Sequence, residues 1–184
     1  LALIVLNKAN KIQSGEYEIT NNINIFTIIT KISTGDVKKY SFRINEAETV
    51  SSVVHRLKQE VKLKNTSLDS LQEQPQNFIK TMAELRVNQK PMQSKLLDLD
   101  KIPNLDGLFY PDTYYYSSKQ SDIDLLSQAY NKLINVLTNL WQESINIYPR
   151  ESDYFKVVST PYQALILASI LEKESADNNE RKII

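Results

Sequence analysis

Glu172 is the residue of this sequence with the clearest potential for chemistry. It follows the run Ala164–Leu171, which is apolar except for Ser169. A helix that is apolar on every side is normally buried. An acid at the end of such a run is paired, faces solvent, or is held protonated in an apolar pocket. The third arrangement yields a general acid that works near neutral pH. A surface acid just past a buried helix is the alternative.

The helix that carries Glu172 has a clear start in the sequence. Thr160 precedes Pro161, and Gln163 follows three positions after Thr160. This pattern is a capping box with proline at the first helical position. We therefore expect a buried helix from Pro161 to about Asp177, with Glu172 three turns into it.

Two acids, Glu172 and Glu174, lie near the end of this helix. Because they are two positions apart, their side chains point about 200° apart around the helix axis and cannot form a pair on one face. We expect one acid to face the interior or a cleft and the other to face water. Glu172 is the candidate and Glu174 the reserve. The residues that share the face of Glu172 one turn earlier are Leu165, Ala168 and Ser169.

The aromatic segment from Tyr110 to Tyr116 is the second candidate for function. Its proline followed by aspartate is ordinary turn chemistry, so a structural turn is one interpretation. The other is a cleft wall, because aromatic rings pack against sugar faces and Asp or Thr side chains bond sugar hydroxyls. The predicted substrate-binding residues are Tyr110, Asp112, Thr113 and Tyr114, with Asp106 before them and Ser169 near Glu172. Ser169 has no nearby base, so it is not a predicted nucleophile.

Composition excludes several other classes of function. The chain has 184 residues, of which 41% are hydrophobic and 24% charged, as in globular proteins. Lysine plus arginine and aspartate plus glutamate both number 22, which argues against a nucleic-acid partner. Without cysteine there is no thiolate chemistry, and the single His55 excludes a histidine-rich metal site. The three glycines are too scattered to form a phosphate-binding loop. We expect neither a metal nor an organic cofactor.

The sequence up to Lys64 predicts a small module of strands and helices. The strands are expected at Glu16–Ile19 and Lys38–Ile44, where apolar and polar residues alternate. A helix capped by Asn22 or Asn24 would end at Gly35. Its expected core residues are Phe26, Ile29 and Ile32. A second helix would follow Thr49, with His55 near its polar side. Its apolar positions are Val50, Val53, Val54, Leu57 and Val61.

The second half of the sequence is expected to be mainly helical. Residues 65–76 suggest a linker or loop, Asn77–Leu85 a short helix with Phe78, Met82 and Leu85 inward, and residues 86–103 are ambiguous. A long amphipathic helix would begin at Ser121 or Asp122 and end near Tyr148. Its apolar positions are Leu125, Leu126, Ala129, Tyr130, Leu133, Val136, Leu137, Leu140 and Trp141.

Three motifs together resemble one known family. The segment Leu167-Ala-Ser-Ile-Leu-Glu-Lys-Glu-Ser175 is similar to the Ala-Ser-Ile-Ile-Glu-Lys-Glu signature of the endolytic murein transglycosylases, the MltG or YceG-like family. Leu105-Asp-Gly-Leu-Phe-Tyr-Pro-Asp-Thr-Tyr114 is similar to that family's Leu-Glu-Gly-x-x-x-Pro-Asp-Thr-Tyr. The third match, Ser14-Gly-Glu-Tyr17 followed by Tyr40-Ser-Phe-Arg-Ile-Asn-Glu46, looks like the LysM-like module that precedes the catalytic domain.

The resemblance implies an α+β protein in which a LysM-like module precedes a mainly helical catalytic domain. The corresponding regions are residues 1–64 for the module, 65–104 for a connection, and 105–184 for the first part of the catalytic domain. The implied reaction cleaves the β-1,4 bond between N-acetylmuramic acid and N-acetylglucosamine within glycan strands. Glu172 would protonate the glycosidic oxygen and then accept the proton of the muramic C6 hydroxyl, leaving a 1,6-anhydro end. Ordinary glycosidases need two carboxylates.

The sequence also departs from the family pattern. Asp106 stands where the family has Glu, and Asn45 and Ala47 stand where it has Pro and Gly around Glu46. Family segments expected after residue 184 are missing, and Leu1–Leu6 resembles the end of an element, so we expect a fragment. The family implies an N-terminal membrane anchor upstream, in the bacterial inner membrane, with the enzyme facing the periplasm or cell wall and possible partners in cell-wall synthesis.

Two other classes of function remain open from the sequence. In the first, the protein is a cell-wall glycan-binding or scaffold protein, and Glu172 is structural. In the second, it is a pyridoxal-phosphate lyase, because similar families have carried an aminodeoxychorismate lyase label. That chemistry needs a Schiff-base lysine and a phosphate cup, which the three scattered glycines do not provide.

Overall fold

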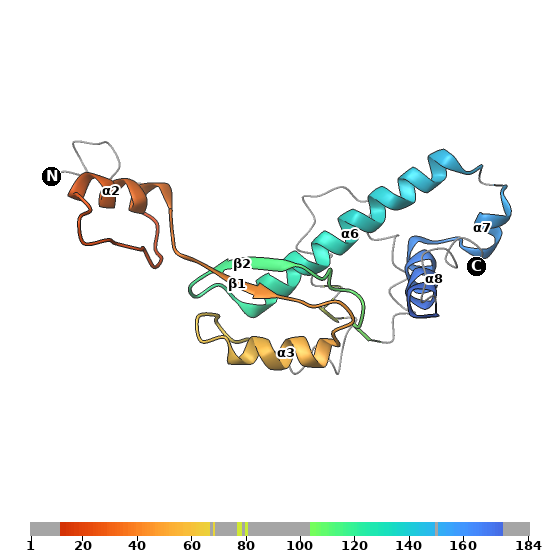
Figure 1. The fold of residues 1–184 in the computed structure, drawn as a ribbon, viewed down its shortest axis with the longest axis horizontal. Coiled ribbons are helices and arrows are strands. Elements are labelled where there is room, and N and C mark those ends of the chain that lie inside the picture. The colour runs from red at the N-terminus through yellow and green to blue at the C-terminus, as the bar shows by residue number, and fades with distance from the viewer. Residues whose placement is uncertain are drawn as a thin grey trace. The chain divides into compact units, whose positions relative to one another are not determined.

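The computed structural model describes residues 12–66, 68, 77–78, 80, 104–149 and 151–174. The chain divides into two compact units, Leu1–Asp69 with Phe109–Ala129, and Ser70–Leu108 with Tyr130–Ile184. The combination of helices with a two-stranded sheet confirms the predicted α+β class. The elements drawn in Figure 1 are α2 (Ile25–Thr34), β1 (Lys39–Arg43), α3 (Val50–Gln59), β2 (Thr113–Ser117), α6 (Asp122–Ile147), α7 (Asp153–Val157) and α8 (Pro161–Glu174).

The sheet of the first unit joins two segments that are far apart in the sequence. Strands β1 and β2 are antiparallel, with Tyr40 opposite Tyr116 and Phe42 opposite Tyr114. Phe42, Tyr114 and Tyr116 are buried, and the rings of Tyr40 and Tyr116 lie 5.7 Å apart. The expected strand at Lys38–Ile44 is confirmed. Its partner comes from the aromatic segment, so the first compact unit extends beyond the boundary expected near Lys64.

Helix α3 packs beside this sheet (Figure 1). Thr49 caps it by accepting a hydrogen bond from the Ser52 N–H at 3.3 Å, and the predicted positions Val50, Val53, Val54 and Leu57 are buried. The Arg56 guanidinium lies 4.7 Å from the centre of the Phe42 ring and donates to the Arg43 carbonyl oxygen at 2.6 Å. From the sheet, the Tyr116 hydroxyl donates to the Glu60 carboxylate at 2.7 Å. The buried side chains of β1 and β2 and the buried apolar side chains of α3 thus form one core.

Helix α2 forms where the caps predict it, with Asn24 at its start and a left-handed Gly35 at its end. Its core is smaller than expected, however. Ile29 is buried, but the Phe26 side chain is 57% exposed, so its assignment to the core was wrong. The buried residues of α2 are Ile29 and Ser33. Phe26 lies three positions before Ile29, on the same side of the helix but in its first turn. Helical spacing identifies an apolar face but does not fix how much of that face finds a packing partner.

Two other predictions for the first unit are wrong. No strand forms at Glu16–Ile19. The Glu16 carbonyl oxygen accepts one backbone hydrogen bond, from Lys38 at 2.7 Å, and the Glu16 carboxylate makes further contacts, so side-chain bonds and not a strand ladder hold this segment. Val61 is not part of the second helix. Helix α3 ends at Gln59, and Val61 is 93% exposed in the loop that follows. His55 is exposed, which agrees with its predicted place near the polar side of the second helix.

The start of α6 is fixed by two separate sets of hydrogen bonds. Ser121 and Asp124 form a reciprocal capping box, with N–H to side-chain oxygen distances of 3.1 and 3.3 Å. Asp122 is 0% exposed. Its carboxylate accepts from the Thr66 N–H at 2.9 Å, from the Thr66 hydroxyl, and from the Ile123 N–H at 2.8 Å. Asp122 therefore fastens the loop after α3 to the first turn of α6.

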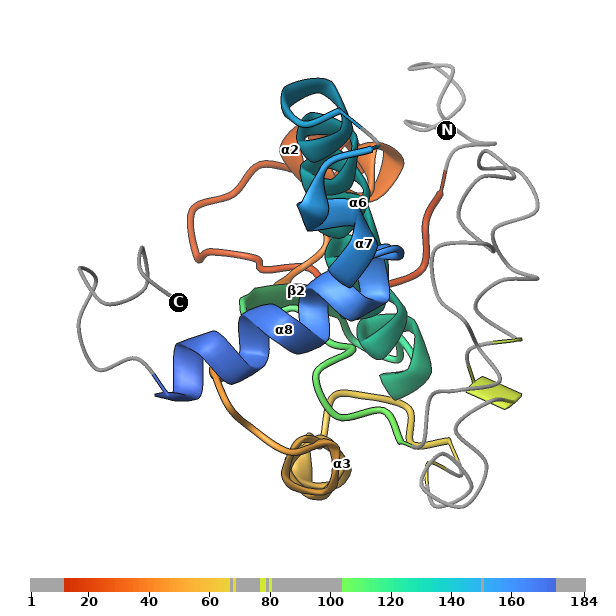
Figure 2. The same ribbon diagram turned by 90° about the vertical axis from the view of Figure 1, so that its right-hand side faces the viewer.

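The second unit contains the remainder of α6, α7 and α8 (Figure 2). Phe78 is buried and meets Tyr130 edge-on, with ring centres 6.1 Å apart. Trp141 meets Phe155 of α7 in the same way at 5.5 Å. The predicted core position Leu140 is 57% exposed, because at this level α6 packs against α7 through Trp141. Met82, Leu85 and residues 86–103 lie outside the described residues. No described helix is both long and apolar enough to cross a membrane.

The turn between β1 and α3 contains a residue in an unfavourable backbone conformation. Ala47 has φ 56°, in the left-handed region where a Cβ atom is strained. The turn around it is fixed, because Glu48 accepts from the Asn45 N–H at 3.0 Å and from Arg56 at 2.7 Å. Ala47 is also the position where the family pattern has glycine.

We predict that Ala47→Gly raises the free energy of unfolding by about 0.5–1 kcal/mol, because glycine removes the left-handed strain but adds freedom to the unfolded chain. Chemical denaturation of the variant measures this. The matched control is Ala164→Gly in α8, which should instead lower stability by about 1 kcal/mol. A loss of stability in Ala47→Gly would contradict the prediction.

Candidate functional site

Helix α8, which carries Glu172, starts where the sequence predicts. The Gln163 N–H donates to the Thr160 hydroxyl oxygen at 3.2 Å, and the Thr160 N–H donates to the Gln163 side-chain oxygen at 3.2 Å. Pro161 is the first helical residue and is buried. The described part of the helix ends at Glu174, so the expected end near Asp177 lies outside the described residues. The capping box thus fixes the position of Glu172 along the helix.

The expected burial of α8 is wrong. Ile166, Leu167 and Ile170 are 43%, 38% and 53% exposed. Pro161 is the only buried residue that the described helix contains. An apolar composition favours burial, but burial also needs partner surfaces on every side, and the described residues provide them on only part of this helix. Sequence composition alone could not reveal this.

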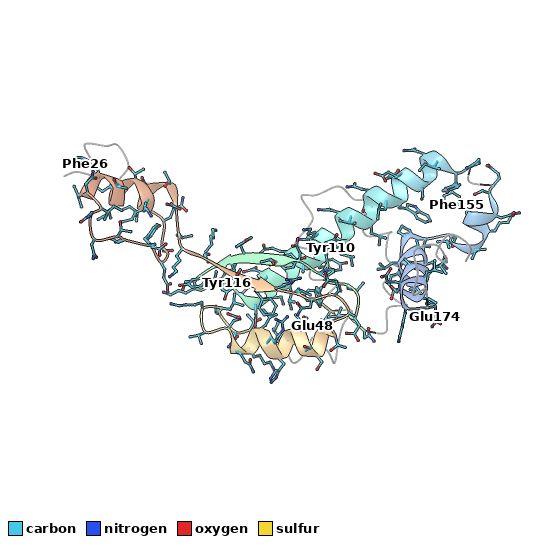
Figure 3. All side chains as sticks on the ribbon, in the orientation of Figure 1. Phe26, Glu48, Tyr110, Tyr116, Phe155 and Glu174 are labelled. Atoms are coloured by element: carbon cyan, nitrogen blue, oxygen red, sulfur yellow. The ribbon has the colours of Figure 1, made fainter. Side chains whose placement is uncertain are left out.

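Glu172 and Glu174 are both exposed, so neither is buried in the interior, and the alternative that one of them faces a cleft stays a prediction. Figure 3 labels Glu174 at the end of α8. On the face of Glu172, the Ser169 hydroxyl donates to the Leu165 carbonyl oxygen at 2.7 Å. The roles predicted for Glu172, Glu174 and Ser169 stay predictions.

The first part of the aromatic motif forms a tight turn in the second unit. The Leu108 N–H donates to the Leu105 carbonyl oxygen at 3.1 Å, and Gly107 at the third position has φ 77°. This geometry is that of a type II turn, whose third position needs a positive φ and therefore favours glycine. The Asp106 N–H donates to the Asn104 side-chain oxygen at 2.9 Å, and Asp106 itself is exposed.

The second part of the motif lies in the first unit and leads into β2. The Tyr114 hydroxyl donates to the Tyr110 carbonyl oxygen at 2.5 Å, which closes the loop on itself. Asp112 accepts from the Thr113 N–H at 2.7 Å through its side chain and from the Ile44 N–H at 2.9 Å through its backbone. Burial, and then the negative charge of Asp112, raise the pKa of the Tyr114 phenol above its ordinary value.

The structure therefore brings together four of the predicted site residues, namely Tyr110, Asp112, Thr113 and Tyr114. Tyr114 is 6% exposed and anchors the loop, whereas Thr113 is exposed and Tyr110 is half-buried. Asp106, Ser169, Glu172 and Glu174 belong to the other compact unit. Their predicted roles in one site stay predictions. Within the described ranges, no group of three or more His, Cys, Asp or Glu side chains is arranged to hold a metal ion.

Sequence reasoning missed a polar cluster centred on Glu16. The Glu16 carboxylate accepts from Lys62 at 2.8 Å, from Ser118 at 3.1 Å and from the Tyr40 hydroxyl. Hydrogen bonds from Lys62 and Tyr40 lower the pKa of Glu16 to about 2. Ser118 lies 102 positions from Glu16 in the chain, so no spacing pattern could have identified the cluster. The only parts of the cluster that the sequence analysis singled out were Glu16 and Tyr40, as members of the match that begins with the Ser14–Tyr17 motif.

Two pockets adjoin the Glu16 cluster. The first has a volume of about 540 Å³ and the second about 500 Å³, and they share Glu16, Ser118 and Lys119. The first is lined by Ser14, Gly15, Glu16, Ser117, Ser118, Lys119 and Gln120. The second is lined by Glu16, Val61, Lys62, Leu63, Lys64, Ser118 and Lys119. Both volumes are within the usual range of small-ligand sites.

The Glu16 cluster makes stability depend on pH. The folded pKa of about 2 lies below the ordinary value of 4.5, so the cluster's contribution is complete above pH 4.5 and is lost as the pH falls towards 2. We predict that Glu16→Gln loses less stability than the wild type between these two pH values. Urea denaturation across this pH range measures it. Glu18→Gln is the control and should follow the wild type. Parallel pH profiles for wild type and Glu16→Gln would contradict the assignment.

Comparison with known proteins identifies the family. No curated protein matched the chain. A crystal structure of a YceG-like protein from Listeria monocytogenes is similar at 22% sequence identity and a TM-score of 0.49, covering 98% of this chain and 56% of that protein. This chain thus spans about half the length of that protein. The model of the YceG-like family matches residues 1–184. The chain therefore belongs to the YceG-like family.

Proposed function

We propose that this chain is part of an endolytic lytic transglycosylase of peptidoglycan, with Glu172 as its general acid and base. The observation that carries the proposal is the family match over residues 1–184, which includes the signature on α8 with Glu172. The proposed reaction cleaves the β-1,4 bond between N-acetylmuramic acid and N-acetylglucosamine within a glycan strand.

In the proposed mechanism, one carboxyl group acts twice. Protonated Glu172 donates its proton to the glycosidic oxygen as the bond to the anomeric carbon breaks. The resulting carboxylate then accepts the proton of the muramic C6 hydroxyl, whose oxygen attacks the anomeric carbon. This step forms the 1,6-anhydro ring and returns Glu172 to its protonated state. Because the nucleophile belongs to the substrate, no second carboxylate is required, unlike in retaining or inverting hydrolases.

Glu172 is exposed on the described α8, so a glycan strand can approach its carboxyl group directly. The proposed reaction therefore takes place at the surface of this helix, where the bound glycan displaces water from around Glu172.

We propose that the first compact unit acts as a LysM-like module that holds glycan strands. The full protein would be anchored in the bacterial inner membrane and face the periplasm or cell wall, where cell-wall synthesis proteins are its natural partners. Tyr110, Asp112, Thr113 and Asp106 are the proposed substrate contacts.

The test uses the full-length ectodomain and purified peptidoglycan. The soluble products are separated and their ends identified by mass spectrometry. The proposal predicts 1,6-anhydro muramic ends, including internal fragments of several disaccharides. Products with reducing muramic ends alone would replace the lytic mechanism with hydrolysis.

A non-catalytic wall-binding protein is the second candidate, and the polar pockets beside Glu16 are the observation that favours it. Experiments with the same ectodomain and purified peptidoglycan distinguish the transglycosylase from the wall-binding protein. Glycan binding that survives Glu172→Gln, with no turnover by the wild type, would support a scaffold. Turnover that depends on Glu172 would exclude it.

A further inference from the structure

The two pockets beside Glu16 differ in charge. We call the one lined by Ser14–Glu16 and Ser117–Gln120 the neutral pocket, because its lining contains one lysine and one glutamate, both of which it shares with the other pocket. The other, lined by Glu16, Val61–Lys64, Ser118 and Lys119, is the cationic pocket, because three lysines face one glutamate. Their shared wall places a neutral, hydroxyl-rich surface directly next to a positive one.

The lysines of the cationic pocket are held on a rigid backbone. The Lys119 N–H donates to the Lys62 carbonyl oxygen at 2.9 Å, and the Lys64 N–H donates to the Gln120 carbonyl oxygen at 2.9 Å. The two segments thus form a short parallel bridge at Lys64. Lys119 is also in the left-handed region, with φ 68°. A non-glycine residue persists in this conformation only where the surroundings fix it.

The positive charge of the cationic pocket is only partly neutralised within it. Lys62 is bound to Glu16 at 2.8 Å, which accounts for the pocket's one carboxylate. Lys64 and Lys119 are exposed and supply an excess of two positive charges. A ligand group that enters this pocket with a negative charge gains charge-assisted hydrogen bonds.

The neutral pocket suits a different chemical group. Its lining has the hydroxyls of Ser14, Ser117 and Ser118 and the amide of Gln120, which are groups that donate to and accept from sugar hydroxyls and acetamides. Gly15 is required in this wall, since a Cβ atom there would lie 2.3 Å from a methyl carbon of Val37. The volume of about 540 Å³ accommodates one sugar ring with its substituent.

We propose that the pocket pair binds a carboxylate-bearing amino sugar, with the ring in the neutral pocket and the carboxylate between Lys64 and Lys119. The choice of a cell-wall sugar rests on the proposed function, whereas the polarity and charge of the pockets do not. In peptidoglycan the carboxylate has two sources, the lactyl group of muramic acid and the stem peptide attached to it. Either one supplies the same negative group next to the ring.

Calorimetric titration tests the proposal, with the chain carrying Glu172→Gln so that no ligand is cleaved. The probes are chitobiose, the peptide-free disaccharide of N-acetylglucosamine and N-acetylmuramic acid, and the same disaccharide with its stem peptide. At low salt we expect at least one carboxylate-bearing probe to bind about tenfold more tightly than chitobiose. If the lactyl group is the source, both do so, and if the peptide is the source, only the peptide-bearing probe does.

Variants of the two lysines make the test specific. Lys64→Ala combined with Lys119→Ala should abolish the preference, whereas Lys156→Ala in the other compact unit should keep it. Lys119→Gly removes the cation and the left-handed strain together, so it should weaken the preference while the protein melts at or above the wild-type temperature. Equal binding of all probes, no binding of any, or a preference that survives the double substitution would overturn the proposal.

The result of the calorimetric titration does not depend on whether the protein cleaves glycan strands. Carboxylate-dependent binding without anhydro products from the ectodomain would leave the inference standing and remove the proposed reaction. Anhydro products without carboxylate-dependent binding would do the reverse.

Discussion

Replacing Glu172 with glutamine is expected to lower the rate of glycan cleavage by the ectodomain about a thousandfold, within the range that a positioned general acid and base contributes. Glutamine has nearly the same size but can neither donate the first proton nor accept the second. Because Glu172 is exposed on α8, the substitution should leave the melting temperature unchanged. Initial rates of release of soluble fragments measure the effect.

Glu174→Gln is the matched control for this prediction. It makes the same chemical change two positions further along α8, on the opposite side of the helix. We expect it to keep most of the wild-type rate. If Glu174→Gln loses the activity and Glu172→Gln keeps it, the proposed acid is the wrong one of the pair. If both retain it, the acid lies elsewhere, with Asp106 and Asp112 next in order.

Replacing Asp122 with alanine is expected to lower the free energy of unfolding by roughly 3 kcal/mol or more, because two part-buried N–H groups and a hydroxyl lose their buried acceptor. Asp122 is 0% exposed and binds Thr66 and Ile123. Urea denaturation followed by circular dichroism measures the loss as a lower midpoint with an unchanged slope.

Asp124→Ala is the control for the Asp122 prediction. Asp124 lies in the same first turn of α6 and takes part in the Ser121 capping box, but it is exposed. We expect its loss to cost about 0.5–1 kcal/mol, as for other caps. Asp122→Asn should fall between the two, because it keeps one acceptor oxygen. Equal costs for Asp122→Ala and Asp124→Ala would show that the buried carboxylate does not fasten the loop to α6.

Local features of this fold could be predicted from the sequence. Asn24, Thr49, Ser121 and Thr160 each begin a helix where the capping pattern indicates. These signals depend on residues within one turn of each other, and the hydrogen bonds that satisfy the first N–H groups are local. The β1 strand was equally visible from its alternation.

Pairings between distant segments could not be predicted. The partner of β1 is β2, beyond a long intervening stretch, and the Asp122 carboxylate binds Thr66 at a separation of 56 positions. No periodicity within either segment specifies such a partner. The Glu16 cluster, which joins four segments, was missed for the same reason.

In the candidate site, too, local features could be predicted from the sequence and packing between distant segments could not. The capping pattern predicted the start of the helix that carries Glu172, because it depends on local geometry. The turn at Gly107 was not predicted. The sequence did not predict the exposure of α8, because exposure depends on what packs against a helix and not on the helix itself. Tyr114 was assigned to the substrate, yet its hydroxyl binds the Tyr110 carbonyl oxygen within the loop.

In the proposed mechanism, the nucleophile comes from the substrate and not from water. The most direct test is digestion of peptidoglycan by the wild-type ectodomain in water enriched with heavy oxygen, followed by mass spectrometry of the new muramic ends. Attack by the C6 hydroxyl predicts anhydro ends that contain no solvent oxygen, and Glu172→Gln should produce none of them. New muramic ends that carry the heavy oxygen would show that water attacks the anomeric carbon and would exclude the transglycosylase mechanism.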